Sequence, residues 1–267
     1  MANVSRTQIV ATLGPSSEDP ATIEALIAHQ MDVARINMTW GSHEEATRII
    51  THVREAAEKA GRKVPVMLDL SGPRVQEKGG HHFAEGTVRI ITDKDMKDID
   101  FGVALGVEYF AQSYVGEAKD VDDLSAMLDE KGSYAHVVAK IERQKAIDNL
   151  DAIIAASDVI MVARGDLGNE LPFERIPFVQ NTIVKKANAA GKPVIVATEM
   201  LASMIEQGVP SRSDVTDIAL AVLMGADAVM LSNETAVGKF PVEAVAVMEK
   251  VVIEAERHDP SKPRFAL

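Results

Sequence analysis

The stretch from His136 to Asp166 reads HVVAKIERQKAIDNLDAIIAASDVIMVARGD. It contains the pattern of a strand, a helix and a second strand. It opens on the β-branched run His136–Ile141 and closes on a second such run, Val159–Val162, with a helical pattern over Lys145–Ala156 between them. Both runs are apolar at consecutive positions, which is typical of parallel strands covered on both faces. The stretch therefore predicts a β-α-β unit.

The same alternation extends along all 267 residues. The expected strands are Gln8–Leu13, Val33–Ile36, Val64–Leu68, Tyr109–Gln112, His136–Ile141, Val159–Val162, Val194–Ala197 and Ala228–Leu231. The expected helices are Thr22–Gln30, Glu44–Lys59, Asp120–Glu130, Lys145–Ala156, Phe178–Ala190, Asp214–Met224 and Val242–Arg257. Glycine follows several of these helices as a stop signal, at Gly61, Gly132, Gly191 and Gly225.

Strands and helices in this number and order predict an α/β fold, a (β/α)₈ TIM barrel that forms a single domain over residues 1–267. The alternative is a doubly wound open sheet, which usually has a G-x-G-x-x-G turn after its first strand. Here the first strand is followed by Gly14-Pro15-Ser16-Ser17. The stretch 72–86 breaks the pattern and predicts a long loop or a short hairpin, with His81 and His82 as a solvated pair rather than as ligands.

The composition excludes several classes of protein. There are 28 basic and 40 acidic residues, a net charge of −12 that disfavours binding to nucleic acid. There is no cysteine, which excludes disulfides, thiol nucleophiles and cysteine-ligated metals. No apolar run reaches the roughly 20 residues needed to cross a bilayer. We therefore expect a cytoplasmic protein without nucleic-acid or membrane partners.

Polar residues follow the expected strands at their carboxyl ends, where barrel enzymes carry their active sites. Lys140 and Glu142 lie two residues apart at one strand end, so their side chains point the same way. Gly165 and Asp166 follow the next strand. Glu142 and Asp166 together supply the hard oxygen ligands that Mg²⁺ or Mn²⁺ prefers. The alternative is that they are ordinary solvated acidic residues, but a buried lysine beside them is costly unless it is paired or functional.

Several motifs resemble the catalytic barrel of pyruvate kinases and occur in the family's order. These segments are Thr7–Ser17 (TQIVATLGPSS), Ala34–Asn37 (ARIN), Ala139–Glu142 (AKIE), Met161–Gly168 (MVARGDLG), Gly191–Leu201 (GKPVIVATEML) and Gly225–Ala236 (GADAVMLSNETA).

The resemblance implies roles for individual residues. Lys140, Thr198, Arg35 and Glu234 would be catalytic, with Lys140 donating to an enolate oxygen and Thr198 and Glu234 carrying a proton. Arg35, Asn37, Gly165, Asp166 and Thr198 would bind the substrate, and Glu142 and Asp166 would bind Mg²⁺ or Mn²⁺. The resemblance also implies a homo-oligomer, either a dimer or a tetramer.

The chain also departs from the family. By comparison with the family, we expect the stretch 72–86 to stand in place of the lid domain and the chain to lack the C-terminal domain. The family's Asp-Thr-Lys-Gly-Pro-Glu-Ile-Arg becomes Asp69-Leu-Ser-Gly-Pro-Arg-Val-Gln76, which lacks the threonine, the lysine and the last arginine. The family's K⁺ site corresponds to Asn37, Thr39, Asp69 and Leu70, so K⁺ binding is in doubt.

These losses fall on the parts that would hold a nucleotide, whereas the parts that enolise a pyruvate-like acid remain. The main expectation is therefore a metal-dependent lyase, such as a decarboxylase or an aldolase, that acts on a small 2-oxo acid such as oxaloacetate or another pyruvate derivative. One alternative is a residual pyruvate kinase-type phosphotransferase that uses phosphoenolpyruvate. The other is a non-catalytic barrel that binds a metabolite.

Overall fold

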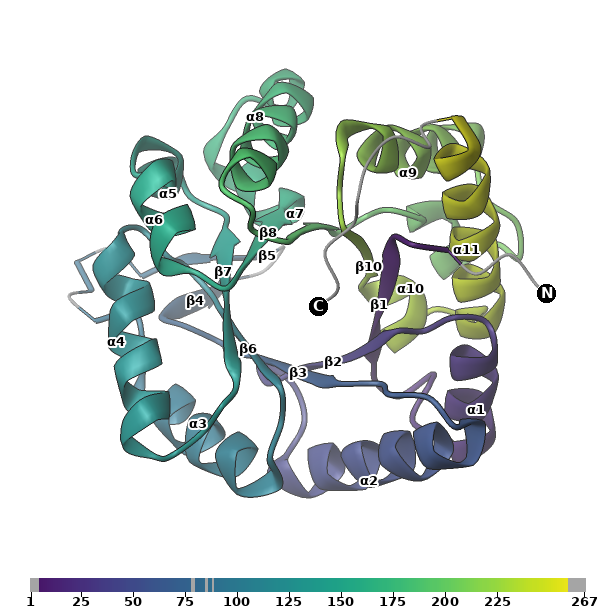
Figure 1. Ribbon diagram of the computed structural model, residues 1–267, viewed down its shortest axis with the longest axis horizontal. Helices are drawn as coiled ribbons and strands as arrows, with labels where there is room; N and C mark the ends of the chain where they lie inside the picture. The colour runs from purple at the N-terminus through teal and green to yellow at the C-terminus, as the bar shows by residue number, and fades with distance from the viewer. Residues whose placement is uncertain (1–4, 78–79, 85, 88, 259–267) are drawn as a thin grey trace. The chain divides into compact units, whose positions relative to one another are not determined.

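The computed structural model describes residues 5–77, 80–84, 86–87 and 89–258. Its main sheet is a closed barrel in the strand order β1-β10-β9-β8-β7-β6-β3-β2, which confirms the predicted fold class. Figure 1 labels the strands and helices. The strands are β1 (Gln8–Leu13), β2 (Val33–Asn37), β3 (Val66–Asp69), β6 (Tyr109–Gln112), β7 (His136–Ile141), β8 (Val159–Ala163), β9 (Val194–Ala197) and β10 (Ala228–Leu231). Their ends agree with the predicted ones to within two residues.

The chain divides into two compact units. The first contains Met1–Ile36, Glu44–Val66 and Pro193–Leu267, and the second contains Asn37–His43 and Met67–Lys192. The expectation of one domain over residues 1–267 stays a prediction.

In the first unit, β1 pairs in parallel with both β10 and β2, and β10 pairs with β9. The helices of this unit are α1 (Pro20–Ala28), α2 (His43–Ala60), α9 (Arg212–Met224), α10 (Asn233–Ala236) and α11 (Pro241–His258), with a 3₁₀ turn, η2 (Ala202–Ile205). Helix α11 packs against α1 and α9 and against β1. A stripe of small and β-branched side chains, including Ile49, Ile50 and Val53, is the buried face of α2, as its sequence periodicity predicts.

In the second unit, β6 pairs in parallel with β3 and β7, and β7 pairs with β8. Its helices are α3 (Asp93–Leu105), α4 (Ala118–Glu130), α5 (Gln144–Asp148), α6 (Leu150–Ala156), α7 (Arg164–Glu170) and α8 (Ile176–Ala189), with a 3₁₀ turn, η1 (Phe173–Arg175). The helix expected over Lys145–Ala156 is two helices, because Asn149 leaves the helical conformation between them. The residues directly after β8, expected to form a loop, form helix α7 instead.

Helix α3 lies where the sequence patterns predict no helix. Its apolar positions are few, since charged residues fill its first half. A reciprocal capping box nevertheless marks its start: the Thr92 side chain accepts from the Asp95 N–H, and the Asp95 carboxylate accepts from the Thr92 N–H. This local signal is the one that could have located α3.

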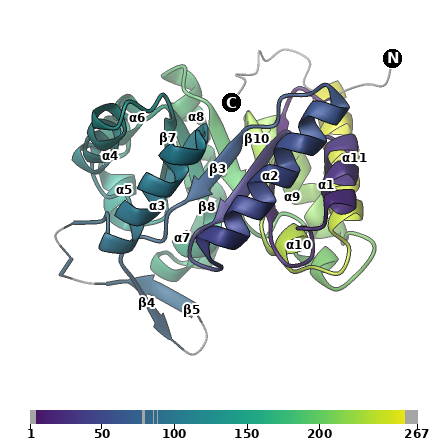
Figure 2. The ribbon, with the colours of Figure 1, turned by 90° about the horizontal axis from the view of Figure 1, so that it is seen from below.

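The irregular stretch 72–86 contains a short antiparallel hairpin, which confirms the hairpin alternative over the long loop. Strand β4 (Arg74–Glu77) pairs with β5 (Gly80–Phe83), with Arg74 opposite Phe83. Figure 2 shows this hairpin projecting from its unit. The side chains of His81 and His82 lie outside the described residues, so their expected solvation stays a prediction.

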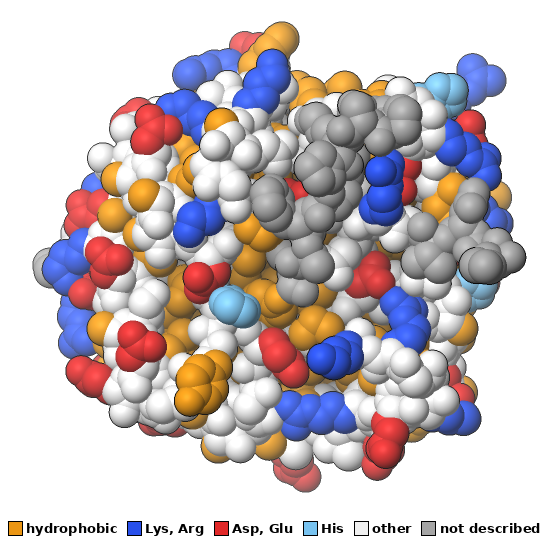
Figure 3. Space-filling model, in the orientation of Figure 1, with side chains coloured by type: hydrophobic (Ala, Val, Ile, Leu, Met, Phe, Trp, Pro, Cys, Tyr) orange, Lys and Arg blue, Asp and Glu red, His pale blue; other side chains and the backbone are white. Residues whose placement is uncertain are grey.

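Two surface features bear on possible partners. Acidic and basic side chains are interspersed over the face seen in Figure 3. Within the described part of the chain, no helix combines the length and the apolar character that a membrane span requires.

Candidate active site

A buried lysine is the centre of the polar cluster in the second unit. Lys140, on β7, is 5% exposed, and its Nζ donates to Ser113 Oγ at 2.6 Å and to Asp69 Oδ1 at 3.1 Å. The same Nζ lies 3.3 Å from Glu142 Oε2. The ammonium group therefore sits between two buried carboxylates, and this pairing offsets the cost of removing three charges from water.

Glu142 is 2% exposed, and its two carboxylate oxygens have different partners. Its Oε1 accepts the main-chain N–H of Tyr114 at 2.5 Å, whereas its Oε2 accepts no hydrogen bond and has only the ion pair with Lys140. Burial raises the pKa of Glu142 to about 7; the positive charge of Lys140 opposes this shift and the negative charge of Asp166 adds to it. Glu142 thus has a buried oxygen that could accept a cation.

Asp166 lies in the first turn of α7, directly after β8, and is half-buried. Its charge acts on both Glu142 and Tyr114, so the second unit brings the two predicted metal ligands into one electrostatic environment. No cluster of three His, Asp or Glu side chains suited to a metal occurs among the described residues. Two carboxylates fit Mg²⁺ or Mn²⁺, because Mg²⁺ usually keeps several waters and takes only one or two protein carboxylates along with substrate oxygens.

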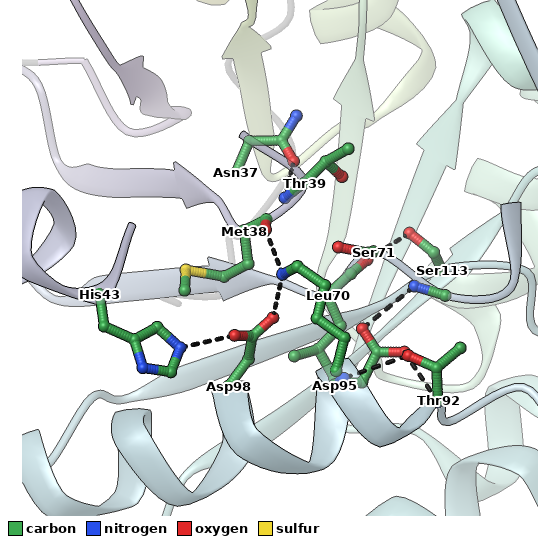
Figure 4. A network of polar contacts seen from close by, with 12 residues as sticks. Asn37, Met38, Thr39, His43, Leu70, Ser71, Thr92, Asp95, Asp98 and Ser113 are labelled. Carbon is green, nitrogen blue, oxygen red and sulfur yellow. Dashed lines mark hydrogen bonds and ion pairs between the residues drawn. The ribbon is translucent and has the colours of Figure 1, made fainter. Parts of the chain in front are cut away.

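Asn37, a predicted substrate-binding residue of this unit, is the last residue of β2, and Gly165, another, lies beside Asp166 in α7. The Asn37 side-chain carbonyl accepts the main-chain N–H of Thr39 at 3.0 Å, and Thr39 Oγ1 is buried without a hydrogen-bond partner (Figure 4). Leu70 contributes no side-chain oxygen and is 2% exposed. One of the four positions matching the family's K⁺ site therefore lacks a side-chain ligand, which disfavours K⁺ binding there.

Helix α3 holds the loop after β2 and the start of the hairpin in place (Figure 4). Lys94 Nζ donates to the Met38 carbonyl at 2.5 Å and to Asp98 Oδ2 at 2.6 Å, and His43 Nε2 lies 2.7 Å from Asp98 Oδ1. One turn away, Asp95 Oδ1 accepts the Gly72 N–H at 3.2 Å. The sequence patterns missed these supporting residues together with α3.

Sequence reasoning also missed Ser113 and Tyr114. Ser113 Oγ donates to the Leu70 carbonyl at 2.7 Å and accepts from Lys140. Tyr114 adopts a positive φ of 61°, which is uncommon for a residue other than glycine. Both residues directly follow β6, and their position at a strand end is the only sequence signal that could have found them.

The first unit holds Arg35 in a hydrogen-bonded chain. Arg35 is 7% exposed, and its Nη1 donates to Thr12 Oγ1 at 2.7 Å. Thr12 Oγ1 donates in turn to the Leu231 carbonyl at 2.8 Å. Thr235 Oγ1 fixes the same strand end by donating to the Thr12 carbonyl at 2.8 Å. The guanidinium is therefore preorganised at the end of β2.

The turn after β9 places Thr198 and Glu199 in the left-handed region, with φ of 72° and 55°. A positive φ at a β-branched residue is a genuine outlier, and such strain gathers at functional sites. Glu234, which is 1% exposed, accepts the Leu201 N–H at Oε1 and the Ser232 N–H at Oε2, at 3.1 and 2.7 Å. Both oxygens of Glu234 are therefore engaged with the backbone, which gives this carboxylate a positioning role beside its expected part in proton transfer.

Comparison with known proteins agrees with the motifs. The family model described as "Pyruvate kinase, barrel domain" matches residues 4–89 and 84–245. The pyruvate kinase of Mycobacterium tuberculosis (strain H37Rv) is 35% identical over 338 residues, covering 97% of this chain and 72% of that protein. The pyruvate kinase of Thermococcus litoralis is 35% identical over 333 residues, with 95% and 70% covered. That of Geobacillus stearothermophilus is 33% identical, with 94% and 57% covered.

These alignments are longer than the 267 residues of the chain, so the relatives carry additional residues inside the aligned region. The two parts of the family match meet at residues 84–89, directly after the β4–β5 hairpin. The hairpin therefore lies within the first matched part, just before the residues where the two parts meet.

Proposed function

This chain belongs to the pyruvate kinase family, and we propose that it is a phosphotransferase acting on phosphoenolpyruvate. The observation that carries the proposal is Lys140, buried between Asp69 and Glu142 at the end of β7, with the charge of Asp166 acting on Glu142. An ammonium group in this setting is suited to neutralise negative charge that develops on a substrate oxygen.

The proposed reaction exchanges one phosphorus–oxygen bond for another. The bond between phosphorus and the enol oxygen of phosphoenolpyruvate breaks, and a bond forms between phosphorus and a terminal oxygen of a nucleoside diphosphate. The electron pair left on the enol oxygen makes an enolate, which becomes pyruvate when its methylene carbon takes a proton. The protein contributes mainly by positioning the reactants and by balancing charge.

In the second unit, Lys140 donates to the enolate oxygen as charge develops there. Glu142 and Asp166 would hold Mg²⁺ or Mn²⁺, which when bound acts as a Lewis acid toward substrate oxygens. Gly165, beside Asp166 in the first turn of α7, would bind a substrate carboxylate, and Asn37 would contribute a polar contact.

In the first unit, Arg35 would bind an anionic group of the substrate, because Thr12 holds its guanidinium in a fixed position and a guanidinium suits charge-assisted contact with an anion. Thr198 carries the proton to or from the methylene carbon. Glu234 positions Thr198 by accepting the N–H of Leu201, which lies three residues after Thr198.

The comparisons favour this reading over the lyase expected as the main function, for which they offer no support. One observation keeps the lyase as a second candidate. Leu70 and Ser71 stand where the family stretch has threonine and lysine, and Ser71 Oγ is buried without a hydrogen-bond partner. A site that lost these groups could enolise pyruvate without transferring phosphate.

The test is to incubate the protein with phosphoenolpyruvate, ADP and Mg²⁺ and to follow ATP and pyruvate by ³¹P and ¹H NMR. A matched reaction contains pyruvate and Mg²⁺ in D₂O, and a third contains oxaloacetate. ATP formation that depends on both substrates supports the phosphotransferase. Methyl-proton exchange or decarboxylation without ATP formation refutes it and leaves the lyase as the function.

Assembly into a dimer or tetramer remains a prediction. Light scattering at micromolar concentration tests it, and a monomeric mass would contradict it.

A further inference from the structure

Two arginines and two aromatic rings alternate beside the candidate metal ligands. The arginine–aromatic cluster consists of Arg74 on β4, Phe83 on β5, Tyr114 after β6 and Arg143 after β7. The Arg143 guanidinium carbon lies 3.6 Å from the centroid of the Phe83 ring, and that of Arg74 lies 5.9 Å from the Tyr114 centroid. The two rings are 5.5 Å apart. Cation–π contacts thus fix both guanidinium groups.

Hydrogen bonds hold the same two guanidinium groups without neutralising them. Arg74 Nε donates to the Ser71 carbonyl at 3.0 Å, and Arg143 Nη1 donates to the Tyr114 carbonyl at 3.1 Å. Arg143 Nε is buried and has no hydrogen-bond partner. Neither arginine forms an ion pair with any residue in the part of the chain described, although acidic residues outnumber basic ones by 40 to 28.

Both arginines are half-buried, and each guanidinium uses one N–H group in a hydrogen bond to a main-chain carbonyl. Each touches Tyr114, whose main-chain N–H binds Glu142. The charges of Arg74, Arg143, Glu142 and Asp166 all act on the Tyr114 side chain. The two cations and the two candidate metal ligands therefore surround one residue.

We propose that Arg74 and Arg143 form a binding site for a polyphosphate anion, the diphosphate end of the second substrate. A guanidinium that keeps several N–H donors free and is fixed by stacking suits bidentate contact with phosphate oxygens. The β4–β5 hairpin (Figure 2) supplies one arginine and the ring that orients the other, and Lys140 belongs to the same unit. The assignment to the second substrate rests on the proposed function; the binding of the anion does not.

Isothermal titration with inorganic pyrophosphate tests the site in a metal-free buffer containing chelator. We expect Arg74→Gln and Arg143→Gln each to weaken binding by about tenfold or more, since each removes a charge-assisted contact. Arg175→Gln is the matched control, because Arg175 is exposed in η1 of the same unit, and it should bind as the natural protein does. Undetectable binding by the natural protein, or unchanged binding in both variants, would overturn the proposal.

Arg143 also packs on Phe83, so Phe83→Leu separates packing from charge. This variant keeps both guanidinium groups, and we expect it to lose less affinity than either arginine variant. An equal loss would assign the effect to hairpin packing and overturn the proposal.

Competition identifies the source of the anion. ADP should displace pyrophosphate from the natural protein, and phosphoenolpyruvate should not. The reverse pattern would overturn the assignment to the second substrate. No turnover is measured, so these outcomes are independent of the test of the proposed function.

Discussion

The main-chain N–H of Tyr114 donates a 2.5 Å hydrogen bond to Oε1 of Glu142, which joins the end of β6 to the end of β7. Tyr114 reaches this position with a φ of 61°, and the ring that this conformation directs toward the hairpin packs against Phe83. One strained residue thus connects the candidate metal ligand to the β4–β5 hairpin.

The pH dependence of stability should reveal the buried Glu142. Its pKa rises from an ordinary value of 4.5 to about 7 in the folded protein, mainly through burial. Between these values the folded state binds more protons than the unfolded state, so the free energy of unfolding falls as pH rises. Urea unfolding of the metal-free protein from pH 4.5 to 8 measures this slope. Glu142→Gln should flatten it, and an equal slope in that variant would contradict the assignment.

Replacing Lys140 by methionine should lower turnover by about 10²–10³-fold, since it removes a preorganised donor to a developing oxyanion. The same change leaves Asp69 and Glu142 without their shared cation. Breaking a buried pair in this way costs roughly 3–5 kcal/mol, so stability should fall as well.

Lys186→Met on α8 is the control for Lys140→Met, because Lys186 pairs with Asp151 at the surface. Its turnover and its unfolding midpoint should stay near those of the natural protein. Turnover by Lys140→Met at the natural rate would remove Lys140 from the mechanism.

Metal binding should depend on Asp166. Asp166→Ala should weaken Mn²⁺ binding by at least tenfold, as followed by electron paramagnetic resonance, and chelator should abolish turnover of the natural protein. Glu170→Ala changes an exposed carboxylate in the same helix, whose oxygen accepts the Gln144 N–H, and should leave the metal titration unchanged. Equal Mn²⁺ affinity in the Asp166 and Glu170 variants would refute the metal site.

The two strained residues after β9 should respond differently to glycine. Thr198→Gly and Glu199→Gly each relieve a positive φ, and we expect each to raise stability by about 1 kcal/mol. Only Thr198→Gly should also lower turnover, because it removes the hydroxyl proposed to carry a proton. Thermal unfolding and steady-state rates check both effects, and Thr198→Ser should recover much of the activity. A fully active Thr198→Gly variant would exclude that role.

Arg35→Gln should raise the KM for phosphoenolpyruvate by about tenfold or more, since a charge-assisted contact is lost. Thr12→Val should produce a smaller effect of the same kind, because it removes only the hydroxyl that accepts from Arg35. Unchanged KM values in both variants would show that Arg35 does not bind phosphoenolpyruvate.

The sequence by itself determined the alternation of strands and helices. The spacing of apolar residues differs between a buried strand and an amphipathic helix, and this spacing can be read within each segment alone. It also placed Lys140, Glu142 and Asp166 at or just after the ends of strands, where the structure has them, whereas their roles stay predictions. The glycine stop signals after α2, α4, α8 and α9 were equally local, and Gly61, Gly132, Gly191 and Gly225 all have positive φ.

Tertiary structure alone decided which groups meet those residues. Ser113 hydrogen-bonds to Lys140, 27 positions away, and Arg143 stacks on Phe83, which lies in another element. Neither contact produces a periodic pattern in the sequence. Helix α3 has a weak apolar pattern, and its capping box is its one local signal; its bonds to the Met38 carbonyl and the Gly72 N–H join segments far apart in the sequence. Such contacts depend on the distance between side chains in space, which no single segment encodes.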